Sequence, residues 1–376
     1  MGILSWLKKK EARSEGQAAH AAGSKPVAAT KAEAAAPASG PAPKSDAKTR
    51  PAPGPETRGS ATTTPAPQPE RSEDAAALPA RIEPTPEQRD RAQQLVAEVA
   101  RCWEQGIETL PPFPPLAGRL VGLLGSEELD VREVVKVIGL EPTVAAGVLR
   151  ASNSALYSRG IEITNLKQAV VRLGPRESAR VALSMATRQL FDLSRRAAEA
   201  RFEHLQQAFW RHALTVAFTA SGLAVKYQRG DPERALIAGM LHDIGKNVAL
   251  AYLSELPGAS QESDTVVLLV CREVHEAFGE DLARRWQLPE VVSQTCGHHH
   301  GAGPLTNENR FETQWVRIAS LVDTRLHGPV LEPDLERSII NALSGLELEL
   351  ADEHQMVADL SAFLTQIGQK VAGLMA

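Results

Sequence analysis

Three features are scarce or missing in this 376-residue chain, and each absence excludes a class of protein. The chain has only three cysteines, Cys102, Cys271 and Cys296, without CxxC spacing, which excludes a disulfide framework and a zinc ribbon. It contains no run of 18 apolar residues, which excludes a spanning helix. It has no segment of strand-like apolar and polar alternation. We therefore expect a cytoplasmic protein built from helices, with no transmembrane segment.

Basic charge is also too sparse to form a long positive stripe. The formal net charge is −5, and the first 85 residues carry 12 Lys and Arg against 9 Asp and Glu, which leaves −8 for the remainder. Non-specific binding to nucleic acid depends on neutralising phosphates with basic side chains. An acidic body of this kind predicts no nucleic-acid partner.

Residues 1–85 differ in composition from the rest of the chain. They hold 12 of the 25 prolines and a single aromatic side chain, Trp6. Such a segment buries too little apolar surface to offset the entropy of ordering it, so we expect a disordered Ala/Pro-rich tether. Ile3, Leu4, Trp6 and Leu7 precede three lysines, which leaves two alternatives, a weak membrane-surface or partner anchor and an ordinary chain terminus.

From Pro86 onward the apolar spacing becomes helical. Thr85 is a candidate N-cap for a lead helix over 86–109, which a proline-rich segment then ends. Further helices are predicted at 116–124, 131–138, 142–151, 166–173, 176–191, 201–227, 231–253, 263–285, 289–297, 311–326 and 354–374. The fold class is all-α, a multi-helical bundle. Residues 306–376 are expected to complete it, with a homodimer through the last helix as the alternative.

The run from Leu241 to Lys246 carries the strongest chemical signal. His242 and Asp243 are adjacent, and adjacent side chains of a helix diverge by roughly 100°. They can bind one metal ion only if the helix ends or is distorted there, and we expect Gly245 to supply that irregularity. Lys246, one turn beyond Asp243, is a candidate contact for a phosphate oxygen.

Other histidines follow at intervals that suit a helical bundle. His212, His242, His275 and His299 are separated by 30, 33 and 24 residues, which allows one ligand from each successive helix. Mixed imidazole and carboxylate ligands suit Fe, Mn, Zn or Ni, and a metal-bound water could attack a phosphoester.

Each residue also has a simpler interpretation. His212 could be a hydrogen-bonded histidine of the core, and Lys246 an exposed cation at a helix end. The triplet His298, His299 and His300 could lie in a solvated loop. The metal-site interpretation depends on the convergence of all these residues at one point.

Several motifs resemble the HDOD (HD-related output domain) proteins of bacteria over about residues 108–305. The motifs are Leu110-Pro111-Pro112-Phe113-Pro114, Glu141-Pro142-Thr143-Val144, Ala151-Ser152-Asn153-Ser154-Ala155-Leu156-Tyr157, Ala169-Val170-Val171-Arg172-Leu173-Gly174, the run Ala238 to Lys246, His275 followed by Arg285-Trp286-Gln287-Leu288-Pro289, and the histidine triplet. The resemblance implies a domain over 110–305, with a short-helix subdomain at 110–195 and an HD-like bundle at 196–305.

The resemblance also implies a function and a ligand set. HDOD domains are related to the HD and HD-GYP metal-dependent phosphohydrolases but are generally non-catalytic signalling modules that act through other proteins. Transferred position by position, Lys246 would face a phosphate, and the metal ligands would be His212, His242, Asp243, His275, His299 and His300.

The sequence departs from the HD pattern at the end of that ligand set. HD enzymes close the metal site with an Asp after an Ala, whereas this chain has Ala319 and Ser320. Asp323, three residues further on the same helical face, is a candidate ligand in its place if the helix shifts register. Ala208 stands where two-metal relatives often carry a carboxylate, and no Gly-Tyr-Pro motif follows the histidines. We expect a non-catalytic regulatory module that binds signalling proteins. The alternative is a metal-dependent phosphohydrolase acting on a nucleotide or cyclic dinucleotide.

Overall fold

The computed structural model describes residues 83–106, 112–158, 160–191, 200–301, 305, 308–328, 335–346 and 353–375. All regular secondary structure within these ranges is helical, which confirms the all-α prediction. None of the described helices is both long enough and apolar enough to cross a membrane. The tether expected over 1–85, apart from its last three residues, and the Ile3, Trp6 and Leu7 patch lie outside the described residues.

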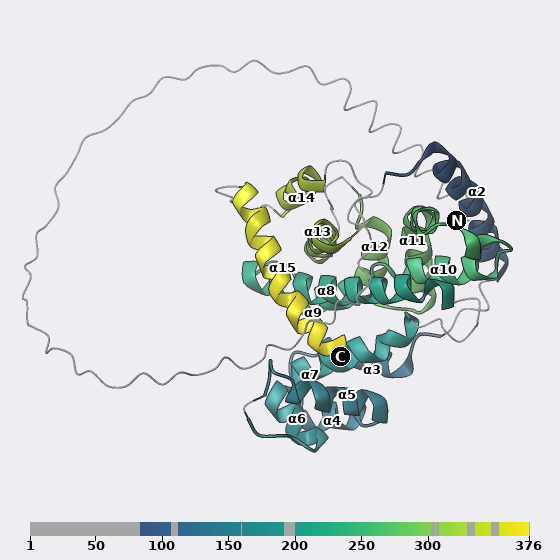
Figure 1. Cartoon of the computed structure of the whole chain (residues 1–376). Coiled ribbons are helices and arrows are strands. Elements are labelled where there is room, and N and C mark those ends of the chain that lie inside the picture. Colours follow the sequence, from purple (N-terminus) through teal and green to yellow (C-terminus); the bar gives the residue numbers. More distant parts are fainter. Residues whose placement is uncertain are drawn as a thin grey trace, which may run out of the picture. The chain divides into compact units, whose positions relative to one another are not determined.

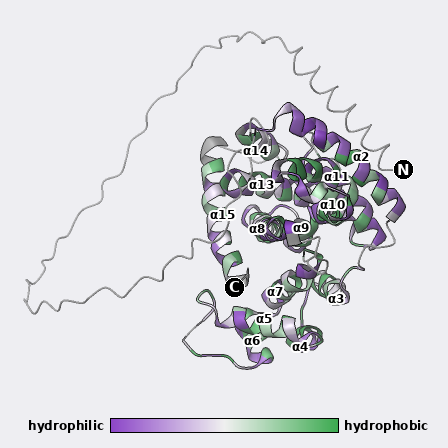
Figure 2. Ribbon diagram, turned by 45° about the vertical axis from the view of Figure 1, so that its right-hand side comes forward, coloured by the Kyte–Doolittle hydropathy of each residue, from purple (hydrophilic) through white to green (hydrophobic). Residues whose placement is uncertain are grey.

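The first described helix, α2 (Pro86–Gly106), begins at the cap that the sequence predicts. The Thr85 amide donates to Oε1 of Gln88 at 2.9 Å, and the Gln88 amide donates to Oγ1 of Thr85 at 3.3 Å, which forms a capping box. Hydrophilic residues run along much of α2 (Figure 2). On its buried face, Trp103 stacks on Phe278 with ring centroids 4.5 Å apart.

Five short helices follow, and their starts carry recognisable sequence signals (Figure 1). They are α3 (Pro115–Leu124), α4 (Val131–Ile138), α5 (Pro142–Asn153), α6 (Leu166–Leu173) and α7 (Pro175–Thr187). Proline occupies the first position of α3, α5 and α7, while the side chains of Asp130 and Asn165 cap α4 and α6. A short 3₁₀ turn, η2 (Arg188–Leu190), extends α7 almost to the predicted end at 191.

The longer helices carry the histidines. They are α8 (Glu203–Tyr227), α9 (Pro232–Leu241), α10 (Ile244–Glu255), α11 (Asp264–Arg285), α12 (Glu290–His298) and α13 (Arg310–His327), with 3₁₀ turns η3 (Ala200–Phe202) and η4 (Ala259–Gln261). Helix α8 packs against α9 and α13, and α11 packs against α10, α12 and α2. The pattern over 231–253 is interrupted, because α9 ends at Leu241 and α10 starts at Ile244.

The C-terminal region contributes two more helices, α14 (Leu335–Ser344) and α15 (Glu353–Met375). Helix α15 packs against α8, α13 and α14 and also reaches α5. Trp315, Ile318, Leu321 and Val322 are buried on the inner face of α13, as the spacing predicts. All described residues lie within one compact unit, so the proposed division at 195 and 196 stays a prediction.

Candidate metal centre

The histidines predicted from the sequence converge on Asp243. The Oδ2 atom of Asp243 lies 3.2 Å from Nε2 of His242 and 3.4 Å from Nε2 of His212. Its Oδ1 atom lies 3.4 Å from Nε2 of both His275 and His299. The side chains come from α8, the α9–α10 junction, α11 and the end of α12. His299 is buried, so the solvated-loop interpretation does not describe it, whereas a hydrogen-bonded core histidine stays an alternative for His212.

The break between α9 and α10 allows adjacent residues to point into one cluster. His242 keeps helical angles, but Asp243, at φ −105° and ψ 11°, leaves the helix and is the N-cap residue of α10. Gly245 does not cause this break, contrary to the sequence-based expectation, because it lies inside α10. A Cβ atom at Gly245 would lie 2.0 Å from the carbonyl oxygen of His275. Gly245 is required for the close approach of α10 to α11.

The outer nitrogens of three imidazoles face main-chain carbonyls. Nδ1 of His242 is 2.8 Å from the Gly239 carbonyl, Nδ1 of His275 is 2.9 Å from that of Arg272, and Nδ1 of His299 is 3.0 Å from that of Thr295. A carbonyl oxygen only accepts hydrogen bonds, so these Nδ1 atoms must carry the proton. In the neutral ring the lone pair is then on Nε2, which is the tautomer that binds a metal from the Asp243 side.

Several inward-facing atoms are buried without a hydrogen-bond partner among the described residues. They include Nε2 of His242, Nε2 of His299 and Oδ1 of Asp243. The 3.4 Å contacts to Asp243 are longer than a well-formed hydrogen bond. Leaving such atoms unpaired is costly, whereas a cation among them would satisfy all of them. The cluster therefore fits a divalent metal ion.

Two groupings of ligand atoms share this centre. One contains Asp243, His275, His299 and His300, and the other contains His212, His242 and Asp243, with the ligand atoms in each group within 4.8 Å of one another. Asp243 belongs to both groupings and is their only carboxylate. His300 is the exposed member of the set.

Asp323 lies outside both groupings. Its Oδ2 atom is 2.6 Å from Nδ1 of His212, and its Oδ1 atom is 3.0 Å from Nδ1 of His327. Ser320 faces the inner side of the same ring, with Oγ 3.3 Å from Nε2 of His212. The structure thus places Asp323 behind the His212 ring and does not bring it to the position of the missing closing ligand.

Charge inside the cluster is concentrated on one ion pair. Burial alone would raise the pKa of Asp243, but His242 and Lys246 override this effect and hold the pKa well below its usual range. Nζ of Lys246 lies 2.5 Å from Oδ2 of Asp243, and the Lys246 side chain is 19% exposed. In this arrangement Lys246 neutralises Asp243, while part of the Lys246 side chain reaches the surface.

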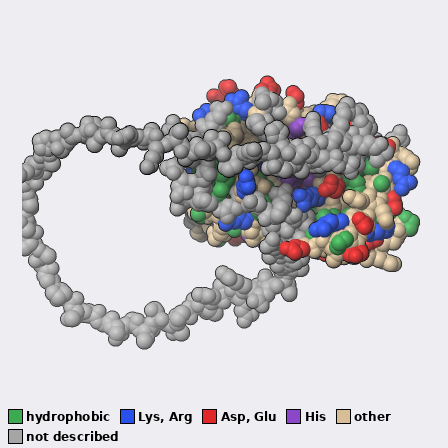
Figure 3. Space-filling view, turned by 90° about the horizontal axis from the view of Figure 1, so that it is seen from above, with side chains coloured by type: hydrophobic (Ala, Val, Ile, Leu, Met, Phe, Trp, Pro, Cys, Tyr) green, Lys and Arg blue, Asp and Glu red, His purple; other side chains and the backbone are tan. Residues whose placement is uncertain are grey.

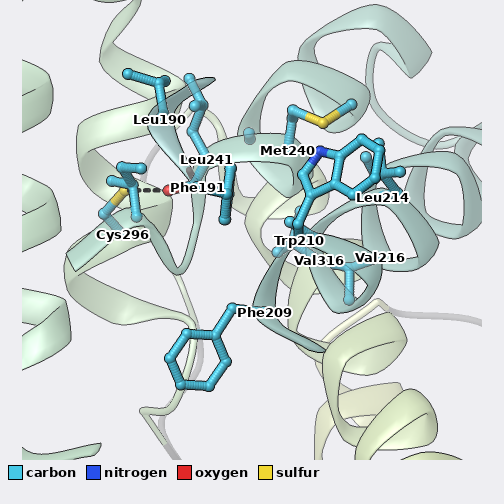
Figure 4. Packing of buried hydrophobic residues seen from close by; sticks show 14 of the residues in the cluster. Leu190, Phe191, Phe209, Trp210, Leu214, Val216, Met240, Leu241, Cys296 and Val316 are labelled. Carbon is cyan, nitrogen blue, oxygen red and sulfur yellow. Dashed lines mark hydrogen bonds between the residues drawn. The ribbon is translucent and has the colours of Figure 1, made fainter. Parts of the chain in front are cut away.

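Two buried cysteines support the backbone beside the cluster. The Cys296 thiol contacts the carbonyl oxygen of Leu241 at 3.4 Å, the bond drawn as a dashed line in Figure 4, and so ties α12 to the end of α9. Cys271 approaches the Lys246 carbonyl at 3.8 Å, and burial raises the pKa of its thiol to about 12. Both thiols are therefore neutral packing groups, which agrees with the absence of CxxC spacing.

Three residues that support the ligands were not predicted from the sequence. His327 contacts Asp323, while Arg317 and Glu276 contact the backbone of the histidine triplet. The spacing of His327, four residues after Asp323 on one helix, is a signal that could have identified it. Arg317 interrupts an otherwise apolar stretch of α13, which is a weaker signal.

Comparison with known proteins identifies the domain family of the chain. The model of the HDOD domain matches residues 110–302. An uncharacterised protein of Treponema pallidum is 22% identical over 268 residues, which cover 68% of this chain and 49% of that protein. The chain therefore corresponds to about half the length of that relative.

Solved structures show the same fold. A protein of Shewanella amazonensis, provisionally named a metal-dependent phosphohydrolase, is 20% identical with a TM-score of 0.56 over 74% of this chain and 99% of that one. An HDOD domain protein of unknown function from Geobacter sulfurreducens is 23% identical with a TM-score of 0.56, covering 75% and 98%. At these identities the likeness is evidence of fold alone. Because the family match spans just over half of its residues, the chain belongs to the HDOD domain family.

Proposed function

We propose that this protein is a regulatory module that binds a divalent metal ion in its His/Asp cluster and acts through a signalling protein partner, without hydrolysing a phosphoester. The proposed ligands are His212, His242, Asp243, His275, His299 and His300. An ion bound there would join α8, α9, α10, α11 and α12, so metal binding would stabilise the arrangement of these helices.

The scarcity of carboxylates is the observation that carries this proposal. Hydrolytic two-metal sites need anionic ligands that bridge the ions and offset their charge. Here Asp243 is the only carboxylate of the two ligand groupings, and Lys246 already neutralises it. Ser320 contributes a neutral hydroxyl at the closing position. This donor set favours a mainly imidazole site with a structural or regulatory role.

Two exposed apolar side chains after α5, near backbone groups that are held by hydrogen bonds, support binding to a protein. The Asn153 side chain donates to the Ile163 carbonyl at 2.7 Å and accepts from the Ile163 amide at 2.9 Å, while Arg172 donates to the Ile161 carbonyl at 2.7 Å. Even so, Leu156 and Ile161 are 59% and 72% exposed. We take these two exposed apolar side chains, next to backbone that Asn153 and Arg172 hold, as the proposed contact surface for a protein.

The charge distribution agrees with a protein partner. On the face drawn in Figure 3, basic and acidic side chains of the described residues are interspersed. This face therefore lacks the concentrated positive field that phosphate backbones require.

Metal loading and turnover of the same samples test the proposal. The full chain is stripped with a chelator and then titrated with Fe²⁺, Mn²⁺, Zn²⁺ or Ni²⁺, with thermal stability as the readout. We expect metal to raise the Tm of the wild type but not of His242→Ala or Asp243→Ala. His204→Ala, a partly exposed histidine of α8 that pairs with Asp264, is the matched control. Loaded wild type is expected to leave cyclic di-GMP and bis(p-nitrophenyl) phosphate intact.

A second candidate, the metal-dependent phosphohydrolase, is favoured by one observation. Two members of the cluster reach solvent, because the Lys246 side chain is 19% exposed and His300 is exposed, and either side chain could contact an anionic substrate. Metal-dependent turnover of either phosphodiester, lost in Lys246→Met and Asp243→Ala, would establish this candidate and contradict the first.

A capture experiment tests the partner. The full chain and an Ile161→Asp variant are used to capture proteins from the native host, each with and without residues 1–82. We expect a specific protein to be retained by the wild type and lost with Ile161→Asp. Equal retention by Ile161→Asp would exclude this proposed contact surface.

A further inference from the structure

The ligand His299 is the C-cap residue of α12, and it is buried although its neighbours His298 and His300 are exposed. The final carbonyl groups of any helix have no partner within the helix. Arg317, buried on the neighbouring helix α13, donates to two of the carbonyl groups at this end of α12. Its Nη2 atom donates to the carbonyl of His298 at 2.7 Å, and its Nε atom donates to the carbonyl of His299 at 3.1 Å.

The direction of the His299 ring depends on this same turn. Its Nδ1 atom faces the carbonyls of Thr295 and Cys296 at 3.0 and 3.2 Å, both one turn earlier in α12. If the turn loosened, these contacts would loosen with it, and the Nε2 atom would lose its direction toward Asp243. The Arg317 guanidinium thus acts on the ligand through the main chain.

A second charged side chain holds the residue that follows. The carboxylate of Glu276, from α11, accepts a hydrogen bond from the His300 amide at 3.3 Å. Glu276 is buried, like Arg317, and their opposite charges interact. The peptide groups on both sides of His299 are therefore fixed by a buried cation and a buried anion.

Arg317 is in turn oriented from the C-terminal region. Its Nη1 atom donates to Oε1 of Gln314 at 3.0 Å, and Nε2 of Gln314 donates to the carbonyl of Ala342 in α14. A continuous chain of hydrogen bonds thus runs from α14 through α13 to the end of α12. It gives the helices beyond residue 305 a link to the cluster.

We infer that Arg317 is a positioning residue of the metal site, which fixes the last turn of α12 and thereby aims the His299 imidazole at Asp243. This inference rests on the proposed metal site for its consequence, since misaligned ligands bind metal less tightly. Lysine cannot replace arginine here, because three acceptors in different directions match the planar fork of a guanidinium and not a single ammonium group.

Arg317→Lys and Arg317→Met are the test variants, and Arg285→Lys and Arg285→Met are their controls. Arg285 lies on α11 with a 48% exposed side chain paired to Asp281. Helical content and Tm of the metal-free proteins identify any variant that fails to fold, and Arg317→Lys keeps the buried charge if Arg317→Met does fail. Each protein is titrated with Co²⁺, whose visible absorption reports its ligands.

We expect Arg317→Lys to bind Co²⁺ about 10- to 100-fold more weakly than wild type, as for other residues that orient metal ligands. In a His299→Ala background the same change should have little further effect, because Arg317 acts through that ligand. The Arg285 variants should bind as wild type does. Wild-type affinity in Arg317→Lys, or an equal loss with and without His299, would overturn the inference.

A metal-free readout separates this inference from the proposed function. The amides of His299 and Gly301 donate to the carbonyls of Thr295 and His298 within the turn that Arg317 holds. We expect their hydrogen exchange to be faster by roughly tenfold or more in Arg317→Lys, and unchanged in Arg285→Lys. If wild type binds no Co²⁺, the metal proposal fails, and unchanged exchange at these two amides would then also refute the positioning role.

Discussion

Asp323 lies directly behind His212, with its Oδ2 atom 2.6 Å from Nδ1 of that imidazole. The inner atom of the same ring, Nε2, is 3.4 Å from Asp243. A carboxylate on the outer nitrogen of a metal-binding histidine fixes the ring and raises its basicity. Asp323 is therefore expected to tune a ligand from outside the cluster and not to replace the missing closing carboxylate.

Replacing Asp323 with asparagine tests this outer role. Asp323→Asn keeps the size of the side chain but removes its charge, so we expect the affinity for Zn²⁺ to fall by about tenfold, well short of the loss in His212→Ala. Isothermal titration calorimetry on the metal-free chain measures both. Asp281→Asn, a surface residue paired with Arg285, is the control. Complete loss of binding in Asp323→Asn, with His212→Ala still binding, would show that Asp323 is the ligand.

Restoring the closing carboxylate should lower the stability of the metal-free protein and increase the stabilisation by metal. An aspartate at position 320 would extend into the cluster beside Asp243, because the Ser320 hydroxyl already lies 3.3 Å from Nε2 of His212. We expect Ser320→Asp to lower the Tm of the metal-free protein through repulsion and to enlarge the rise in Tm on adding Mn²⁺. Ser344→Asp, exposed at the end of α14, should change neither value. Identical Tm values for the two variants would argue against a ligand position at 320.

Because α10 and α11 are in close contact at Gly245, adding one methyl group there should lower the stability of the protein. In Gly245→Ala the new Cβ meets the His275 carbonyl at 2.0 Å, so the two helices must separate. We expect the free energy of unfolding to fall by about 1–3 kcal/mol or more. At Gly122 in α3 nothing lies within 4 Å, and Gly122→Ala should stabilise the protein by about 0.5–1 kcal/mol. Urea unfolding curves compare them, and similar values for both variants would contradict the packing described here.

A network of hydrogen bonds and ion pairs around Glu177 should make the folding stability fall at low pH. Glu177 in α7 accepts a hydrogen bond from Tyr157 at 2.7 Å and pairs with Lys370 of α15. Burial raises the pKa of Glu177, but Lys370, Tyr157 and Arg180 together lower it below its usual value. A lowered folded-state pKa stabilises the protein above the unfolded-state pKa of about 4.3, and this contribution is lost as the pH falls through the folded-state value.

Glu177→Gln measures that contribution. We expect the variant to be less stable than wild type by about 1–3 kcal/mol at pH 7 and the difference to shrink progressively below about pH 4. Unfolding by urea between pH 7 and pH 3 gives the comparison, with Glu128→Gln, an exposed residue, as the control. A difference that stays constant over this range would mean that the Glu177 charge is not responsible.

The helices were predictable because their signals are local. Thr85 and Gln88 cap α2 within one turn, and prolines start α3, α5 and α7. The division of the pattern over 231–253 was not visible in its apolar spacing. It follows from tertiary packing, since Asp243 leaves the helix where histidines from α8, α11 and the end of α12 converge on it.

The ligand residues of the candidate site could be predicted from the sequence, but the residues that hold those ligands in place could not. Residue type and spacing identified the histidines and Asp243, whose convergence needs only a bundle. The positions of Asp323 and Arg317 depend on how α13 is rotated against α8 and α12, which periodicity does not specify to one residue. The role of Gly245 was misread for the same reason, because close approach between helices is a tertiary property.

Metal content is the most direct test of the central claim. The full chain and Asp243→Ala are incubated with equal amounts of Fe²⁺, Mn²⁺, Zn²⁺ and Ni²⁺ under anaerobic conditions, desalted, and analysed for metal by mass spectrometry. We predict that wild type retains at least one ion per chain and that Asp243→Ala retains none. Equal retention by the two proteins, or no retention by either, would contradict a metal site at Asp243.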